Sequence, residues 1–254
     1  MHAQDSSWRI SRMKTCALKS KHLPRTFCWF SSTVMKFCLA VFLLGSIGIL
    51  FSNDYSSLPN DIRWVRQSGE YKELCMQVYR QAWYQVNRQA GSGSTKLAVV
   101  VDLDETVLDN SLYQVGRWGK GLGFTQESWS EWVNQKEAGL VPGAKVFLEK
   151  TRNLGVTVIF MSNRMHHNLK PTIENLKELK IWQKEDLFLL REDKQDTKDI
   201  RRKEVLEGTG RMKKVGPLKV LAYLGDQVGD FPNKSGEVFG VSQFLLPNPT
   251  YGKW

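Results

Sequence analysis

Two aspartates separated by one residue follow an apolar run in the middle of the chain. The run LAVVV at 97–101 leads into DLDET, which contains Asp102 and Asp104. One carboxylate of such a pair can attack phosphorus and form an aspartyl-phosphate, which water then hydrolyses. The other can protonate the leaving alkoxide and later take a proton from that water. The pair therefore indicates phosphoryl transfer, although aspartate is also common as a plain helix cap after a strand.

Strand and helix patterns alternate from the DLDET run to the end of the chain. Apolar runs predict strands at 97–102, 156–162, 186–190, 219–226 and 238–246. Apolar spacing and capping residues such as Thr125 predict helices at 61–90, 125–138, 143–153, 168–180 and 196–207. This alternation is typical of an α/β fold with a doubly wound parallel sheet. In such a sheet the ligand site lies beyond the carboxyl ends of the strands.

Polar residues follow four of the predicted strands. Asp102 ends the first, the run SNR at 162–164 ends the second, the charged segment 191–198 follows the third, and Asp226 ends the fourth. Carboxylates and a backbone carbonyl from DLDET are ligands suited to magnesium. A serine hydroxyl and nearby amides can bind phosphoryl oxygens, and a lysine from the third segment can cancel remaining negative charge. The strand ends therefore predict a single phosphate and metal site.

The same segments resemble known proteins. DLDETVLDN, SNR, DKQDTKDIRR and GDQVGDF resemble, in order, the four motifs of the haloacid-dehalogenase (HAD) phosphatase superfamily. DLDETVLDNSLY, FTQESWSEWV, VPGAKVFL, FMSNR and LPNPTYGKW resemble the class C bacterial non-specific acid phosphatases, a group that includes surface lipoproteins with 5′-nucleotidase activity. The resemblance runs from about residue 61 to the end. It implies a HAD-like Rossmannoid sheet with a small helical cap, expected from 61–90 and 110–140.

Catalytic roles follow from this resemblance position by position. It implies Asp102 as the nucleophile and Asp104 as the general acid and base. Ser162 corresponds to the phosphate-binding hydroxyl. Lys198 corresponds to the motif lysine because it stands at the start of a predicted helix, although Lys194 lies close enough to compete for that role.

The resemblance also implies a cofactor, Mg²⁺. Its ligands would be Asp102, the backbone carbonyl of Asp104, and Asp226, with Asp230 as a second acidic support near the metal. The substrate would be a small phosphomonoester, such as a nucleotide. Five residues would bind it: Asn163 and Arg164 beside the phosphate, and Tyr113, Trp129 and Tyr251 as aromatic surfaces for a nucleobase.

The amino-terminal part predicts export. Phe37 to Phe51 carries no charge and follows a basic stretch, as in a signal peptide or a membrane anchor. We therefore divide the chain into a basic tail or mis-assigned start (1–34), a signal peptide or anchor (35–52) and a phosphatase domain (53–254). The first 36 residues hold much of the net charge of +10, so the charge does not indicate a nucleic-acid polymer as a partner.

Together these features predict an exported, magnesium-dependent acid phosphatase located in the periplasm, at the cell surface or outside the cell. Two alternatives stay open at this stage. A phosphotransferase of the same fold would pass the phosphoryl group to an alcohol in place of water. A non-catalytic, membrane-tethered binding protein would have lost a motif residue, and every motif residue is present. The motifs do not fix the oligomeric state.

Overall fold

The computed structural model describes residues 57–91 and 96–252. The chain divides into two units, 1–53 and 54–254, and the fold below is that of the second unit. The segments 1–34 and 35–52, with the predicted signal peptide or anchor, lie outside the described residues. Among the residues that are described, no helix has the length and apolar character needed to cross a bilayer.

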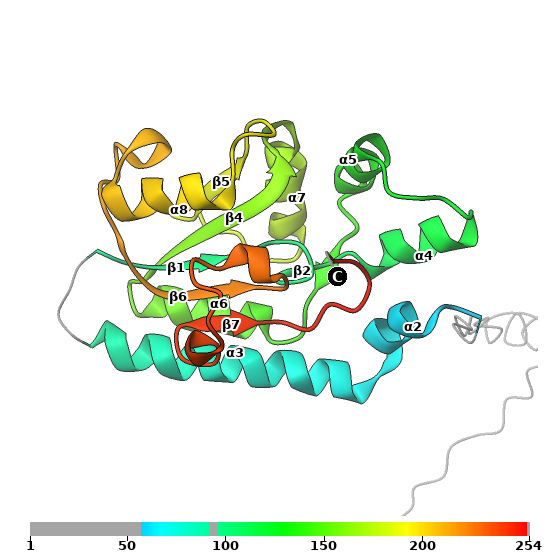
Figure 1. The fold of residues 1–254 in the computed structure, drawn as a ribbon, viewed down its shortest axis with the longest axis horizontal. Helices are drawn as coiled ribbons and strands as arrows, with labels where there is room; N and C mark the ends of the chain where they lie inside the picture. The colour runs from blue at the N-terminus through cyan, green and yellow to red at the C-terminus, as the bar shows by residue number, and fades with distance from the viewer. Residues whose placement is uncertain (1–56, 92–95, 253–254) are drawn as a thin grey trace, which may run out of the picture. The chain divides into compact units, whose positions relative to one another are not determined.

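The centre of the described fold is a parallel sheet of five strands in the order β5-β4-β1-β6-β7 (Figure 1). All five residues of β1 are buried, which explains why its sequence is a continuous run of apolar residues. The predicted doubly wound α/β fold is confirmed. The strands are β1 (Leu97–Val101), β4 (Thr157–Met165), β5 (Leu187–Arg191), β6 (Lys219–Gly225) and β7 (Gln243–Leu245).

Helices cover both faces of this sheet. On one face lie α3 (Gly69–Ala90), α6 (Ala144–Asn153) and α7 (Leu169–Glu178), and on the other lies α8 (Lys198–Glu207). Side chains of β1 alternate between the two layers: Val99 and Val101 pack with the first group, while Val100 packs with Val205 of α8. The sheet is thus a buried layer whose strands can end at one polar edge.

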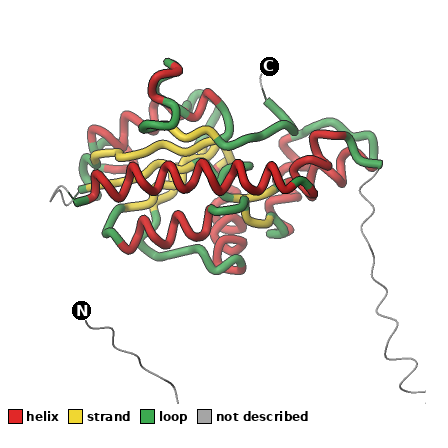
Figure 2. Tube along the Cα trace, turned by 90° about the horizontal axis from the view of Figure 1, so that it is seen from below, coloured by secondary structure: helices red, strands yellow, loops and turns green. Residues whose placement is uncertain are grey.

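The segment 61–90, predicted as one helix of the cap, differs from that prediction. It forms α2 (Asn60–Gln67) and α3, separated at Ser68, whose side chain accepts a hydrogen bond from the Tyr71 N–H at 2.9 Å. Figure 2 shows α3 running across a face of the sheet, where Tyr79 and Val86 are buried. Its assignment to the cap was therefore wrong. The shorter helix, α2, lies beside α4, a helix of the 110–140 insertion.

The insertion after DLDET contains α4 (Ser111–Gly119) and α5 (Gln126–Gln135) between two short antiparallel strands, β2 (Leu108–Asp109) and β3 (Gly139–Leu140). As predicted, Thr125 caps α5, accepting a hydrogen bond from the Ser128 N–H at 3.1 Å. The two helices stand beyond the sheet edge where β1 ends (Figure 1).

Short 3-10 helices fill several connections: η1 (His166–Asn168), η2 (Gly210–Met212), η3 (Val228–Asp230) and η4 (Gly236–Val238). The predicted fifth strand, 238–246, is reduced to β7 because η4 and a turn occupy its first part. The second strand, expected to end at Ser162, continues to Met165, with a shift of register against β5 between these two residues. This shift lies next to the site described below.

Candidate active site

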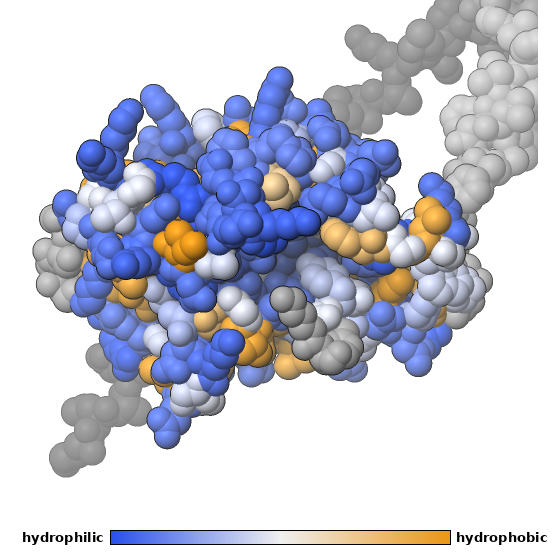
Figure 3. Space-filling model, turned by 45° about the horizontal axis from the view of Figure 1, so that its top comes forward, coloured by the Kyte–Doolittle hydropathy of each residue, from blue (hydrophilic) through white to orange (hydrophobic). Residues whose placement is uncertain are grey.

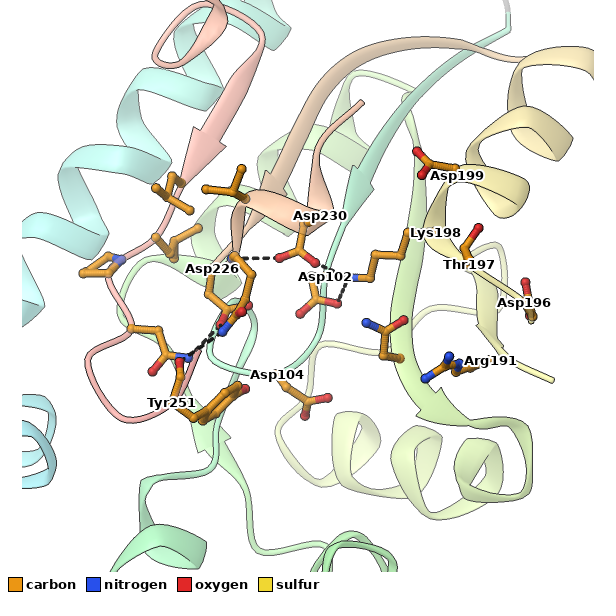
Figure 4. Close-up of a pocket in the computed structure, with 18 residues that line it drawn as sticks. Asp102, Asp104, Arg191, Asp196, Thr197, Lys198, Asp199, Asp226, Asp230 and Tyr251 are labelled. Atoms are coloured by element: carbon orange, nitrogen blue, oxygen red, sulfur yellow. Dashed lines mark hydrogen bonds and ion pairs between the residues drawn. The ribbon is translucent and has the colours of Figure 1, made fainter. Parts of the chain in front are cut away.

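A cavity of about 790 Å³ opens at the carboxyl ends of the strands (Figure 4). It is lined by residues from the end of β1, the bulge in β4, the start of α8, the loop after β6 and the last part of the chain. Hydrophilic residues cover most of the face shown in Figure 3, and the apolar ones lie in separate small patches. The cavity is lined by seven of the predicted site residues: Asp102, Asp104, Asn163, Lys198, Asp226, Asp230 and Tyr251.

Lys198 connects two of the acids. Its ammonium group donates hydrogen bonds to Asp102 and, at 2.7 Å, to Oδ1 of Asp230, and all three side chains are buried. Burial favours a lower pKa for Lys198, but the charges and hydrogen bonds of Asp102 and Asp230 outweigh it and raise that pKa. Lys194, the competing lysine, is exposed and does not line the cavity. The geometry therefore places Lys198 at the acids.

The position of Asp102 is fixed by the sheet. Its N–H donates to the carbonyl of Leu224 at 2.9 Å, which continues the pairing of β1 with β6. Burial raises the pKa of Asp102 well above its ordinary value; Lys198 counteracts this, and the neighbouring acids add to it. An ionised Asp102 therefore depends on positive charge close to its carboxylate.

Three carboxylates stand close enough to share a cation. One oxygen each of Asp102, Asp226 and Asp230 lies within 4.8 Å of the others. Burial, together with the charges of Asp230 and Glu105, raises the pKa of Asp226 to about 8. Crowded carboxylates of this kind need protons or a cation, and hard oxygen donors fit a divalent ion such as Mg²⁺ or Ca²⁺.

A glycine makes this proximity possible. A methyl group at Gly225, the last residue of β6, would lie 2.5 Å from both Cβ and Oδ2 of Asp230. Such a contact is far inside van der Waals distance, so a larger residue would displace Asp230 from the acid cluster. The glycine before Asp226 in GDQVGDF is thus required by the close approach of the η3 loop.

Asp104 is held from the opposite side, by Arg164. The guanidinium donates from Nη2 to Oδ1 at 2.7 Å and from Nε to Oδ1 at 2.9 Å, and the Arg164 side chain is almost fully buried. Ser162 donates its hydroxyl hydrogen to Oδ2 of Asp104 at 3.3 Å and accepts the Arg164 N–H at 3.0 Å. Ser162 and Arg164 do not line the cavity, so in this structure they position Asp104 and do not face the space for a phosphate.

The predicted aromatic residues separate into two groups. Tyr113 and Trp129 are buried in the cap, where their rings make a T-shaped contact at 5.1 Å, and they are not among the cavity residues. Tyr251 does line the cavity, and its hydroxyl donates to Glu105. A sandwich of these three rings around a base is therefore not formed in this structure. Packing of two aromatic side chains against one another is an alternative that spacing alone does not reveal.

Comparison with known proteins agrees with this geometry. A family model described as "HAD superfamily, subfamily IIIB (Acid phosphatase)" matches residues 54–254. The chain belongs to this family. The resemblance noted in the sequence is confirmed, and with it the type of enzyme, a phosphoric monoester hydrolase.

Solved structures of a class C acid phosphatase from Bacillus anthracis are similar to this family member. One is 31% identical with a TM-score of 0.66, and a second, with tungstate bound, is 30% identical with a TM-score of 0.65. Each match covers 76% of this chain and 84% of the other.

Two curated proteins of Glycine max are also similar. Stem 28 kDa glycoprotein is 30% identical over 216 residues, which cover 78% of this chain and 77% of that protein. Stem 31 kDa glycoprotein is 28% identical over 159 residues, 60% of this chain, and the match spans only 58% of its own length.

Some residues of this HAD-family site are not among those predicted from the sequence. Glu105 has a left-handed backbone (φ 53°) and is buried. It accepts the N–H of Asn110 at 3.0 Å, and burial raises its pKa to about 8. Asn248 donates to Oδ2 of Asp226 at 2.7 Å. The position of Asn248 in LPNPTYGKW is a usable signal, because it stands three residues before Tyr251, which the sequence already places at the site. Buried arginines of α8, by contrast, look like part of an exposed charged helix in the sequence.

Proposed function

We propose that this chain hydrolyses small phosphate monoesters through a phosphoryl group carried on Asp102. The observation that carries the proposal is the buried contact of Lys198 with Asp102 in the cavity that also holds Asp104, Asp226 and Asp230. Membership of an acid phosphatase family supports it. The tungstate bound to the Bacillus anthracis relative supports it too, because tungstate is a tetrahedral oxyanion like phosphate.

The first half of the proposed reaction forms the aspartyl-phosphate. A carboxylate oxygen of Asp102 forms a bond to phosphorus while the bond from phosphorus to the ester oxygen breaks. Asp104, in its protonated form, gives its proton to the leaving oxygen, so the product is a neutral alcohol. Lys198 remains protonated beside Asp102 and offsets negative charge on the attacking carboxylate and the phosphoryl group.

The second half regenerates the enzyme. Asp104, now ionised, takes a proton from a water molecule while the water oxygen attacks phosphorus, and the bond between phosphorus and Asp102 breaks. Inorganic phosphate leaves, and Asp104 is again protonated. Arg164 and Ser162 hold Asp104 through both halves, because their hydrogen bonds fix its orientation on the cavity side of DLDET.

We also propose Mg²⁺ as the cation of the acid cluster. Asp102, Asp226 and the backbone carbonyl of Asp104 would hold it, and Asp230 would add negative charge nearby. When bound, the ion would neutralise part of the charge on the phosphoryl oxygens. Asp226 suits the role, because only its Oδ2 has hydrogen-bond partners among the described residues, namely Asn248 and Gln227.

Nucleoside monophosphates are the proposed substrate class. The cavity volume of about 790 Å³ is large enough for a nucleotide, and Asn163, Arg191 and Tyr251 line it around the acids. An aromatic ring such as that of Tyr251 offers a surface on which any base can lie. A comparison of the four ribonucleoside monophosphates with their parent sugar phosphates tests this: kcat/KM values that do not differ would count against a base-binding surface.

Export is a further part of the proposal. It is supported by the uncharged segment from Phe37 to Phe51 behind basic residues. Expression of the full chain, followed by cell fractionation and amino-terminal sequencing of the product, tests it. Activity that stays entirely in the cytosolic fraction, with residues 1–52 still attached, would refute export and would leave the chemistry untouched.

The central experiment is turnover of p-nitrophenyl phosphate and nucleoside monophosphates by the full-length chain, with and without added Mg²⁺. Asp102→Asn keeps the shape of the side chain but removes the nucleophilic charge, so we expect kcat to fall at least about 10³-fold. Glu149→Gln, on the exposed side of α6, is the matched control and should not change kcat. Full activity in Asp102→Asn would overturn the mechanism.

A further inference from the structure

Helix α8 carries two adjacent buried arginines, Arg201 and Arg202, directly after the turn that begins with Lys198. We propose that they are positioning residues with separate tasks. Arg201 fixes the bulge that brings Asn163 to the phosphate side of the cavity. Arg202 fixes the loop that brings Asp230 to the metal side. This inference rests on the proposed function.

Arg201 is fully buried and makes hydrogen bonds to two strands at once. Its Nη1 donates to the carbonyl of Ser162 in β4 at 2.5 Å and to the carbonyl of Leu189 in β5 at 3.0 Å. Its Nη2 donates to Oδ1 of Asn163 at 2.7 Å. The remaining donors meet carbonyl oxygens of the turn before α8, those of Asp196 and Thr197, each at 3.3 Å. All five N–H groups of the guanidinium therefore have acceptors.

The place where Arg201 binds is the irregular part of the sheet. Pairing between β4 and β5 shifts register between Ser162 and Met165, so Asn163 and Arg164 have no regular partners on β5. A bulge of this kind re-aims side chains, and here it places Asn163 on the cavity while Arg164 turns inward to Asp104. Arg201 donates hydrogen bonds to the Ser162 carbonyl and to Asn163 in this bulge, so it fixes the bulge in one conformation.

Arg202 acts on the opposite side of the site. Its Nη1 donates to the backbone carbonyl of Asp230 at 3.0 Å, and its Nη2 forms an ion pair with Asp199. The carboxylate of Asp230 is meanwhile held by Lys198 at 2.7 Å and by the N–H of Gln227 at 2.9 Å. Two residues of one helix turn thus fix both the main chain and the side chain of Asp230.

Helix geometry explains the division of tasks. Residues three and four apart lie on one side of a helix, so Lys198 is close to both arginines. Adjacent residues differ by about 100° around the axis, so Arg201 reaches β4 and β5 while Arg202 reaches η3 after β6. One turn of α8 therefore connects the phosphate side and the metal side of the cavity to the nucleophile.

The planar guanidinium is essential to this proposal, because a lysine keeps the charge but cannot bond several carbonyls in a fixed fork. Arg201→Lys and Arg202→Lys are therefore the test variants. Lys203→Met is the control on the same helix, since its side chain is 72% exposed and contacts Glu207 only at 3.9 Å. All variants are made in the full-length chain. We measure kcat, KM, inhibition by tungstate, and the melting temperature with added Mg²⁺ or tungstate.

For Arg201→Lys we expect kcat to fall about 10- to 100-fold and tungstate inhibition to weaken by a similar factor, as is typical when a supporting contact of an active site is lost. The Mg²⁺ concentration for half-maximal activity should stay within about twofold. For Arg202→Lys we expect that Mg²⁺ concentration to rise about 10-fold or more, while tungstate inhibition at saturating Mg²⁺ stays within about twofold.

A lower melting temperature in both variants, with unchanged kcat, tungstate inhibition and Mg²⁺ requirement, would show that the arginines only stabilise the fold and would overturn the proposal. If Arg201→Lys does not fold, the proposal is tested by Arg202→Lys alone. An unchanged Mg²⁺ requirement in Arg202→Lys would then refute the proposal. A wild-type chain without turnover would refute the proposed function instead. The positioning roles would then still be tested by comparing, between wild type and each variant, the shift in melting temperature that tungstate or Mg²⁺ produces.

Discussion

Two buried regions of this molecule are stabilised in different ways. Beneath α3 and α6, the sheet packs against apolar side chains such as Val86, Phe147 and Leu148. At the carboxyl edge, buried charged groups such as Asp102, Lys198 and Arg201 are linked by directed hydrogen bonds. Apolar packing depends mainly on area and volume, whereas a buried charge network depends on each partner being in place. We therefore expect substitutions in the first region to act on stability and those in the second to act on activity.

The largest effect expected in this comparison comes from Asp104→Asn. The variant keeps the shape of the side chain but cannot exchange a proton with the leaving group, so kcat for a nucleoside monophosphate should fall about 10²- to 10⁴-fold. p-Nitrophenyl phosphate has a leaving group that needs no proton, so its rate of phosphoryl transfer to Asp102 should fall much less. Burst kinetics with both substrates measure that step. Equal losses for the two substrates would contradict the role of Asp104 as general acid.

The variant that tests the apolar region is Leu148→Ala in α6. Leu148 is fully buried in the apolar layer, so its truncation should lower the free energy of unfolding by about 2–5 kcal/mol. Because Leu148 packs in the layer on one face of the sheet and does not line the cavity, kcat of the folded variant should change less than twofold. Urea unfolding and steady-state kinetics give the two numbers.

The control for this variant is Val146→Ala on the same helix, where the side chain is 55% exposed. The free energy of unfolding of Val146→Ala should stay within about 0.5 kcal/mol of that of wild type. A large loss of kcat in Leu148→Ala, without such a loss in Val146→Ala, would show that the apolar layer and the site are coupled, and the comparison would fail.

The two regions also differ in how well the sequence predicted them. Strands buried on both faces appear as continuous apolar runs, so β1 and its neighbours were identified, and Thr125 was recognised as a helix cap. The single helix predicted over 61–90 is interrupted at Ser68: buried apolar residues such as Val65 and Tyr71 stand on both sides of it, and the Ser68 cap separates α2 from α3. Assigning the long helix to the cap was wrong because periodicity shows that a face is apolar, not which surface it meets.

At the site, residues that end strands are more predictable from the sequence than residues that act through other residues. Asp102 and Asp226 meet because parallel strands end at one edge, as the alternation of strands and helices requires. Arg164 was expected beside the phosphate, yet the bulge in β4 turns it inward to Asp104. No pattern in the sequence distinguishes Arg201, since an arginine in a charged helix looks exposed until its acceptors on two strands are known.

The smallest expected effect tests a charged cluster that lies next to the site but outside its chemistry. Asp196 is buried and accepts hydrogen bonds from Arg211, at 2.8 and 3.1 Å, and from the N–H of Glu192 at 2.9 Å. Burial alone favours a higher pKa for Asp196, but these hydrogen bonds and the charges of Arg201 and Arg211 outweigh it and lower that pKa.

A carboxyl whose pKa is lower in the folded than in the unfolded state stabilises the fold above its ordinary pKa and loses that contribution as the pH falls through the folded value. The free energy of unfolding should therefore decrease below about pH 4, the ordinary range of an aspartate. Asp196→Asn should be less stable at neutral pH, by roughly 1–3 kcal/mol for its lost charged hydrogen bonds, and less sensitive to acid. Urea unfolding of wild type and Asp196→Asn between pH 3 and 7 measures this pH dependence of the free energy of unfolding.

Parallel pH profiles of the two proteins would show that Asp196 is not the titrating group. A large fall in kcat would place the cluster within the site, because Arg201 lies between Asp196 and the β4 bulge.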